Sequence, residues 1–172
     1  MALLVLLTVG ASPASAEPLF PNSGFESGTL KNWRATGDAF TAQPTKGDNP
    51  AARGRESSLH DGNYWIGGFE AHTERQGAPG DVRGDQFTGE LTSREFTIAK
   101  RYISFLIGGG AQPGKLGVKL KCDGKEVLLA TGRDSESMTR CNADVNGFVG
   151  KPARLVVFDS ATGDWGHINV DS

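Results

Sequence analysis

The chain alternates apolar and polar residues with a period of two, and this alternation constrains its fold more than any other feature. It recurs in several runs, whose apolar positions are Ile103, Phe105 and Ile107; Val127 and Leu129; Leu155 and Val157; and Ile168 and Val170. Successive side chains of a β-strand point to opposite faces of a sheet, so each run predicts a strand with one apolar face. No convincing amphipathic run of three helical turns interrupts the pattern. The chain is therefore expected to be all-β with little helix.

Turn sequences separate the expected strands. Glycine pairs with aspartate or asparagine at Asp61-Gly62, Asp123-Gly124, Asn146-Gly147 and Gly163-Asp164. Such pairs favour tight turns, and short strands at a spacing of roughly ten residues predict a β-sandwich or a barrel. Residues 43–59 and 72–85 are instead rich in glycine, proline and charged residues. They predict two long loops, and long ordered loops often carry function.

The first sixteen residues have the pattern of a signal peptide. Residues 2–10 are apolar apart from Thr8, and the small-residue triplet Ala14-Ser15-Ala16 predicts cleavage before Glu17. No Lys or Arg precedes the apolar run, and a buried N-terminal strand is the alternative. Pro13 and Pro18 disfavour that strand. The chain is thus expected to be secreted or periplasmic, as a bacterial protein, with residues 17–172 forming one domain.

Charge and hydropathy exclude two classes of partner. The formal net charge is −2, which gives no electrostatic reason to bind nucleic acid or an anionic membrane. After the signal, no apolar run is long enough to span a bilayer. Neither nucleic acid nor a membrane is therefore an expected partner.

Two cysteines remain in the expected mature chain, at Cys122 and Cys141. Alternation places both thiols on the apolar faces of their strands, and an oxidising compartment would allow them to pair. A disulfide between them is therefore predicted. The alternative is two buried free cysteines that act as small hydrophobic residues.

Four segments together carry a resemblance to a known family. They are residues 22–30 (NSGFESGTL) followed by Trp33, residues 62–70 (GNYWIGGFE) followed by 88–93 (TGELTS), residues 103–110 (ISFLIGGG) and residues 163–171 (GDWGHINVD). In this order they resemble the galactose-binding-like jelly-roll domain attached to bacterial fructan hydrolases of the levanase type and found in secreted planctomycete-type proteins. The resemblance implies an antiparallel β-sandwich of jelly-roll topology that binds carbohydrate.

The C-terminus departs from the family pattern, in which a second acidic residue and another apolar residue follow. Here Ser172 stands at the second acidic position, which predicts a fragment of a longer protein. In carbohydrate modules of this type the chain ends meet, and a structural calcium ion often binds there. Glu26 and Asp171 are the expected calcium ligands, because calcium prefers carboxylate oxygens. The alternative is that Glu26 binds backbone amides without metal.

The expected ligand site combines aromatic and charged side chains beside glycine-rich turns. Its residues are Arg53, Arg55, Trp65, Glu70, Trp165 and His167. A sugar offers an apolar C–H face for stacking and hydroxyl edges for directed hydrogen bonds, so it suits this mixture. Two structural alternatives stand beside this prediction. Trp165 could cover one end of the sandwich, and one of the neighbours Tyr64 and Trp65 must face the core.

Motifs for catalysis are absent from the sequence. No zinc spacing such as H-E-x-x-H and no G-x-S-x-G elbow occurs. The glycines at 108–110 lack the Lys and Ser/Thr of a phosphate loop, and Arg83-Gly84-Asp85 is interpreted as a loop. The sequence thus predicts a secreted, non-catalytic carbohydrate-binding module for fructan or other polysaccharide ends. The alternatives are a protein-interaction domain of a cell-surface assembly and an accessory fragment of a glycoside hydrolase.

Overall fold

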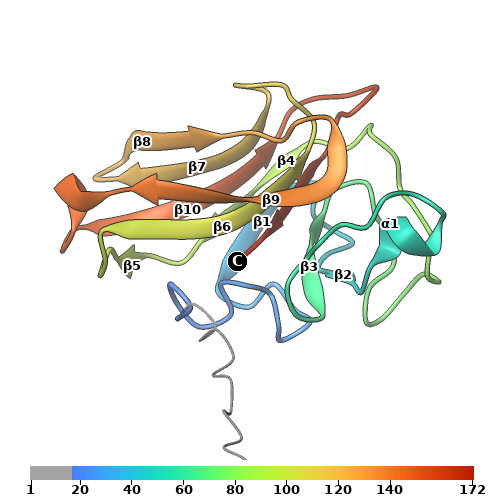
Figure 1. Ribbon diagram of the computed structural model, residues 1–172, viewed down its shortest axis with the longest axis horizontal. Coiled ribbons are helices and arrows are strands. Elements are labelled where there is room, and N and C mark those ends of the chain that lie inside the picture. Colours follow the sequence, from blue (N-terminus) through green and yellow to red (C-terminus); the bar gives the residue numbers. More distant parts are fainter. Residues whose placement is uncertain (1–16) are drawn as a thin grey trace, which may run out of the picture.

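Two antiparallel sheets form the molecule (Figure 1). The computed structural model describes residues 17–172, so the predicted signal peptide lies outside the described residues. The first sheet has the order β1 (Trp33–Gly37), β4 (Gly89–Ser93), β10 (Pro152–Asp159), β7 (Leu116–Cys122) and β8 (Lys125–Ala130), and β5 (Phe96–Thr97) also pairs with β10. The second sheet has the order β2 (Thr45–Lys46), β3 (Tyr64–Gly67), β11 (Ile168–Asp171), β6 (Tyr102–Gly109) and β9 (Ser135–Asp144).

Helical structure is limited to two short segments in the described part of the chain. These are α1 (Asn49–Ala52) and a 3-10 turn (Asn146–Phe148). Strands adjacent in a sheet are mostly distant in sequence, since β10 lies between β4 and β7, and β11 lies between β3 and β6. Such crossings between two packed antiparallel sheets give a jelly-roll sandwich. The predicted fold class, an all-β antiparallel jelly roll, is confirmed.

The core lies between the sheets, as the alternation predicts. Side chains of β6, β7, β10 and β11 fill it, and they include Ile103, Phe105, Ile107, Val118, Leu120, Leu155, Val157, Ile168 and Val170. The opposite face of β11 is also buried, because loops cover Asn169 and His167. The C-terminal strand therefore has no solvent-exposed face.

The loop between β2 and β3 folds over the outer face of the second sheet. Under it lies a small apolar cluster of Trp65, Leu106 and Met138. The Trp65 indole N–H donates to the carbonyl of Gly47 at 2.8 Å, and the His60 ring stacks on the indole at 5.9 Å. The predicted long loop is thus packed structure, and it buries Trp65 completely.

The predicted disulfide is not formed. Cys122 and Cys141 are both free, because Cys122 lies on β7 of the first sheet and Cys141 on β9 of the second. Packed sheets lie about 10 Å apart, whereas a disulfide needs Cα atoms within roughly 7 Å. Burial of Cys122 agrees with the alternative of a small hydrophobic residue. Cys141 is half-buried, and burial raises the pKa of its thiol.

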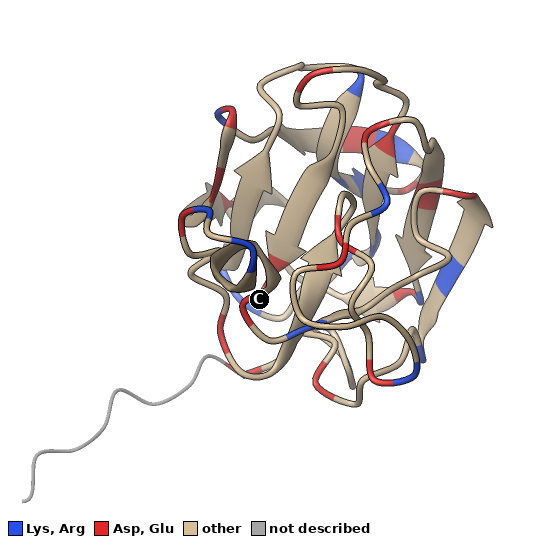
Figure 2. Cartoon of the chain, turned by 90° about the vertical axis from the view of Figure 1, so that its right-hand side faces the viewer, with Lys and Arg blue, Asp and Glu red and all other residues tan. Residues whose placement is uncertain are grey.

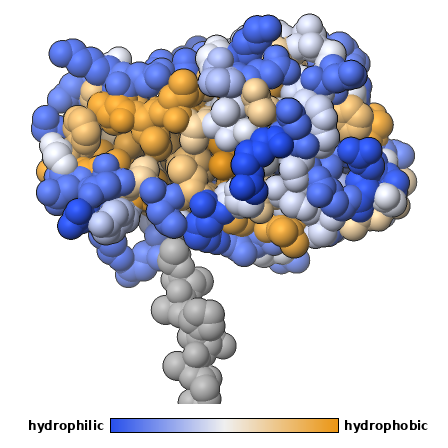
Figure 3. Space-filling model, turned by 45° about the horizontal axis from the view of Figure 1, so that its top comes forward, coloured by the Kyte–Doolittle hydropathy of each residue, from blue (hydrophilic) through white to orange (hydrophobic). Residues whose placement is uncertain are grey.

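Apolar side chains reach the surface at the end of the molecule away from α1 (Figure 3). On β8, Leu129 is 40% exposed, and Val127 and Leu128 are half-buried against the core. Within residues 17–172, no helix has both the length and the apolar character needed to cross a membrane.

Replacing Trp65 with alanine should destabilise the domain by about 3–5 kcal/mol, because it opens a cavity under the covering loop and removes the bond to Gly47. The matched control is Tyr102→Ala, since Tyr102 is an aromatic residue that is 55% exposed. It should change stability by only about 0.5 kcal/mol. Urea unfolding followed by fluorescence and circular dichroism measures both, and equal losses would contradict the burial of Trp65.

Candidate functional site

A hollow of about 290 Å³ opens where several loops meet at one end of the second sheet. Its lining residues are Arg53, Arg55, Phe69, Asp85, Glu136, Asp164, Trp165 and His167. The two arginines follow α1, Glu136 lies near the start of β9, and the last three residues precede β11. We call this region the Trp165 hollow. It joins segments that are more than a hundred residues apart in the sequence.

Trp165 holds a backbone conformation that is unusual for its residue type. Its φ is 57°, in the left-handed region that non-glycine side chains rarely adopt. The indole is half-buried, and its ring lies 5.5 Å from the His167 ring. The guanidinium of Arg55 lies 6.0 Å from the indole centroid. Such conformations persist where the surroundings hold them and cluster at ligand sites, so this one supports a functional role for the loop.

His167 is buried between two carboxylates. Its Nδ1 lies 2.7 Å from Asp85 Oδ1, and its Nε2 lies 3.6 Å from Glu136 Oε2. Burial alone would lower the pKa of His167, but the hydrogen bond to Asp85 and the charges of Asp85 and Glu136 outweigh burial and raise the pKa to about 9. The ring is therefore an imidazolium at neutral pH, and Nδ1–H donates to Asp85.

Arg53 joins Glu136 to a further buried carboxylate, that of Glu70. Its Nη2 donates to Glu70 Oε1 at 2.9 Å and to Glu136 Oε1 at 2.6 Å. Burial would raise the pKa of Glu136, yet His167 and Arg53 lower it to about 2. For Glu70 burial prevails over Arg53 and Asn49, and its pKa is raised. The base of the hollow is thus a charged network with fixed geometry.

Unsatisfied polar atoms gather at this network. Within residues 17–172, four buried side-chain polar atoms have no hydrogen-bond partner, namely Arg53 Nε, His167 Nε2, Asn169 Oδ1 and Ser23 Oγ. Arg53 and His167 line the hollow, and the Asn169 amide donates to Glu136 from behind it. Buried polar groups in native proteins are rarely left unpaired. Two donors, on Arg53 and His167, are therefore available to a polar ligand in the hollow, whereas the Asn169 oxygen lies behind it.

The structure brings together four of the six residues that the sequence predicts for a ligand site. Arg53, Arg55, Trp165 and His167 all line the Trp165 hollow. Trp65 does not, because its side chain is fully buried beneath the loop between β2 and β3. Glu70 does not line it either, because its carboxylate is fully buried behind Arg53. Both positions are corrected from contact residues to supporting residues.

Sequence reasoning missed four lining residues, which are Phe69, Asp85, Glu136 and Asp164. Phe69 and Asp164 lie inside two of the segments that carry the family resemblance, and they could have been included on that ground. Asp85 lies in the expected loop at residues 83–85, yet it is the hydrogen-bond partner of His167. Glu136 had no sequence signal, because its position depends on how β9 pairs with β6.

Neither positive nor negative charge predominates at the end of the molecule that carries α1. Lysines and arginines alternate with aspartates and glutamates along its loops (Figure 2). A ligand at this end would therefore be selected by local hydrogen bonds and stacking, since long-range attraction needs a surplus of one charge.

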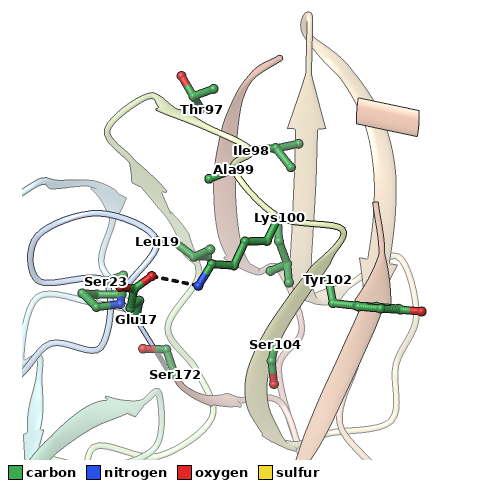
Figure 4. Close-up of a pocket in the computed structure, with 12 residues that line it drawn as sticks. Glu17, Leu19, Ser23, Thr97, Ile98, Ala99, Lys100, Tyr102, Ser104 and Ser172 are labelled. Atoms are coloured by element: carbon green, nitrogen blue, oxygen red, sulfur yellow. Dashed lines mark hydrogen bonds and ion pairs between the residues drawn. The ribbon is translucent and has the colours of Figure 1, made fainter. Parts of the chain in front are cut away.

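A second hollow, of about 210 Å³, lies beside the N-terminal segment (Figure 4). Lys100 Nζ reaches across it to Glu17 Oε2 at 2.8 Å. Both side chains are largely exposed, and exposed pairs contribute little to stability. Tyr102 also lines this hollow, but the ion pair there is exposed, whereas the charges at the base of the Trp165 hollow are mostly buried.

The predicted calcium ligands bind backbone amides. Glu26 accepts hydrogen bonds from the Asn63 and Tyr64 N–H groups, and Asp171 accepts from those of Asp61 and Ser172. All four carboxylate oxygens are used in this way. The described residues contain no group of three acidic, histidine or cysteine side chains placed to hold a metal. The arrangement fits the amide-binding alternative better than it fits a cation.

Calcium binding stays a prediction that thermal melts can check. Asp171 is buried, and burial raises its pKa to about 8, so its carboxyl is mostly protonated at neutral pH unless a cation binds it. Bound calcium would raise the melting temperature relative to a sample in EGTA, and Asp171→Asn would remove the difference. Equal melting temperatures with calcium and with EGTA would leave both carboxylates in the amide-binding role.

Comparisons with known proteins agree with this architecture. No protein-family model matches the chain. A protein of Aspergillus rugulosus that is named as a glycosyl hydrolase, ecdE, is 34% identical over 148 residues, which are 86% of this chain. The chain spans only 19% of that relative's length.

A solved structure covers almost the whole described domain. It is TmCBM61 in complex with β-1,4-galactotriose, with a TM-score of 0.55 and 21% identity, over 91% of this chain and 95% of that one. The chain thus shares the β-sandwich fold of that module. Attachment to a levanase and a planctomycete-type source are not tested by these likenesses and stay predictions.

The charged network predicts a pH dependence of stability. The pKa of His167 is raised from 6.5 to about 9 in the folded protein, so its stabilising effect is complete below pH 6.5 and is lost as the pH rises through about 9. The difference in unfolding free energy between wild type and His167→Gln should therefore shrink across this range. Urea melts at about pH 6, 7.5 and 9 measure it. A difference that stays constant would show that His167 is not charged in the folded state.

Proposed function

We propose that this domain binds carbohydrate in the Trp165 hollow without catalysis. The observation that carries the proposal is the presence of two buried donors without a hydrogen bond, Arg53 Nε and His167 Nε2, at one hollow that also holds a half-buried indole. Such a site can hydrogen-bond hydroxyl groups and stack on a sugar ring at the same time.

Each part of the hollow matches one part of a sugar. The indole of Trp165 offers an apolar platform to the C–H face of a pyranose or furanose ring. Nε2–H of His167 and Nε–H of Arg53 can donate to ring hydroxyls, and the half-exposed Arg55 guanidinium can bridge neighbouring hydroxyls. The carboxylate of Glu136 can accept from the same hydroxyls. Because the network is fixed before binding, little ordering entropy is lost on association.

The ionisation of the hollow argues against glycoside hydrolysis. A retaining or inverting hydrolase needs a protonated carboxylic acid of raised pKa next to the scissile bond. Glu136 has a pKa of about 2 and stays ionised. Glu70 has a raised pKa, but its side chain is fully buried and bound to Arg53 and Asn49. Neither Glu136 nor Glu70 can therefore act as an exposed acid of raised pKa.

The comparisons support the same proposal without naming the sugar. A module of the same fold holds β-1,4-galactotriose, and the A. rugulosus relative, of which this chain spans 19%, is named as a glycosyl hydrolase. We infer that this domain serves as an accessory module that holds a catalytic partner near a polysaccharide. The candidate sugars are galactan, on the structural likeness, and fructan ends, on the sequence resemblance. Secretion of the domain follows from the predicted signal peptide and belongs to the proposal.

Calorimetric titration with β-1,4-galactan, levan and inulin oligosaccharides tests the proposal. Trp165→Ala should lower affinity by about 2 kcal/mol or more, because stacking aromatics are typical hot spots. Trp165→Asn is a second variant, since asparagine tolerates the left-handed conformation of this position. Tyr102→Ala, which removes an exposed aromatic that does not line the hollow, is the matched control and should keep full affinity.

Three outcomes would contradict the proposal. Unchanged affinity in folded Trp165 variants would move the sugar site elsewhere. A flat response to all glycans would favour a protein-interaction domain of a cell-surface assembly instead. Release of reducing sugar by the purified domain would contradict its non-catalytic role.

A further inference from the structure

A groove lies on the outer face of the first sheet, and it is distinct from both hollows described above. It has a volume of about 630 Å³, and its lining residues are Asn32, Trp33, Arg34, Thr36, Glu90, Thr92, Ser93, Arg94 and Arg154. We propose that this arginine groove binds an acidic polysaccharide, a chain of sugars that carry carboxylates. No lining residue is shared with the Trp165 hollow, so this site goes beyond the function proposed above.

The register of the sheet explains why the arginines gather. Strands β1, β4 and β10 lie side by side (Figure 1), with Arg34 opposite Thr92 and Thr92 opposite Val156. On β4 and β10 the alternate residues Leu91 and Leu155 point into the core. Their neighbours therefore point outward on the other face of the sheet.

The arginines of the groove have free hydrogen-bonding capacity. Within residues 17–172, the exposed guanidinium of Arg34 has no hydrogen bond or ion pair, and the guanidinium of Arg94 donates only to the backbone carbonyl of Glu95. Arg154 donates to the Ser93 carbonyl and lies 3.6 Å from the half-exposed Glu95 carboxylate. Glu90 is the single acidic residue in the lining. The lining thus holds three cations and one anion, with the Glu95 carboxylate beside Arg154 as a second anion, in a chain whose overall charge is −2.

The cationic surface continues beyond the groove along β7. Lys121 lies opposite Arg154, and Lys119 lies opposite Val156, both on the outer face. Lys119 Nζ lies 4.1 Å from the centroid of the Phe158 ring and 3.4 Å from Glu126. A ligand that crosses the strands would meet basic side chains on β1, β10 and β7 in turn. This arrangement suits an extended polymer better than a single small anion.

The chemistry of the lining favours acidic sugars over other polyanions. The planar guanidinium forms bidentate hydrogen bonds to carboxylates, and the hydroxyls of Thr36 and Thr92 suit sugar hydroxyls. Single-stranded nucleic acid needs aromatic platforms. The only aromatic residue in the groove lining, Trp33, is stacked on Phe25 at 5.0 Å and donates its indole N–H to Asn22, so it is unavailable for stacking.

Polygalacturonate is the probe that tests the groove, with neutral β-1,4-galactan as its uncharged counterpart. The double variant Arg34→Gln/Arg94→Gln removes two exposed charges from the groove and leaves the backbone contact of Arg154 intact. It should bind polygalacturonate at least ten-fold more weakly than wild type in calorimetry. The matched control is Arg75→Gln/Arg133→Gln, which removes two exposed arginines outside the groove. It should bind within about two-fold of wild type, and raising NaCl from about 50 to 300 mM should weaken binding.

The same titrations separate this proposal from the carbohydrate site at Trp165. Trp165→Ala should retain polygalacturonate binding, whereas the Arg34/Arg94 double variant should bind any neutral ligand of the hollow as wild type does. If wild type does not bind polygalacturonate, the proposal that the arginine groove binds acidic sugars is wrong. It is equally wrong if the groove variant and the control variant lose the same amount of affinity. Tighter binding of a single-stranded oligonucleotide than of polygalacturonate would also overturn its assignment to acidic sugars.

Discussion

The bridge that Arg53 makes between Glu70 and Glu136 is the interaction on which the functional end of the molecule depends. It connects the loop after α1, the loop after β3 and strand β9 through one guanidinium group. Both carboxylates are almost fully buried, so loss of Arg53 would leave uncompensated charges, which typically costs about 3–5 kcal/mol. The loops at this end therefore hold one arrangement, although they contain almost no regular secondary structure.

The same bridge controls the electrostatics of the hollow. Arg53 helps to keep Glu136 ionised, and Glu136 together with Asp85 keeps His167 protonated. Trp165 precedes His167 by two residues, and its ring lies against the imidazolium. The binding surface is thus prearranged by charges that lie beneath it, as in sites where a supporting layer fixes the groups that touch a ligand. The sandwich contributes the rigid strands on which these loops are anchored.

The two surfaces of the domain use different physics. At the Trp165 hollow, charges of both signs compensate each other and the stacking ring and directed hydrogen bonds remain. On the outer face of the first sheet, cations outnumber anions and no aromatic side chain is free. A polysaccharide with neutral and acidic stretches could therefore contact one domain in two ways. Linking two weak contacts on one chain raises the overall affinity without a new contact at either site.

Local patterns in the sequence determined the architecture, because the period of two and the glycine turns depend only on neighbouring residues. The inward positions of Ile103, Phe105 and Leu155 follow from them directly. The tertiary structure decides which face of a sheet a loop covers and which strands belong to the same sheet. The burial of Trp65 and the separation of Cys122 from Cys141 could therefore not be deduced from the sequence. Arg53, Arg55, Trp165 and His167 were identifiable by residue chemistry. Only the tertiary structure places these residues next to Asp85 and Glu136, because strands far apart in the chain must pair before the side chains come within hydrogen-bonding distance.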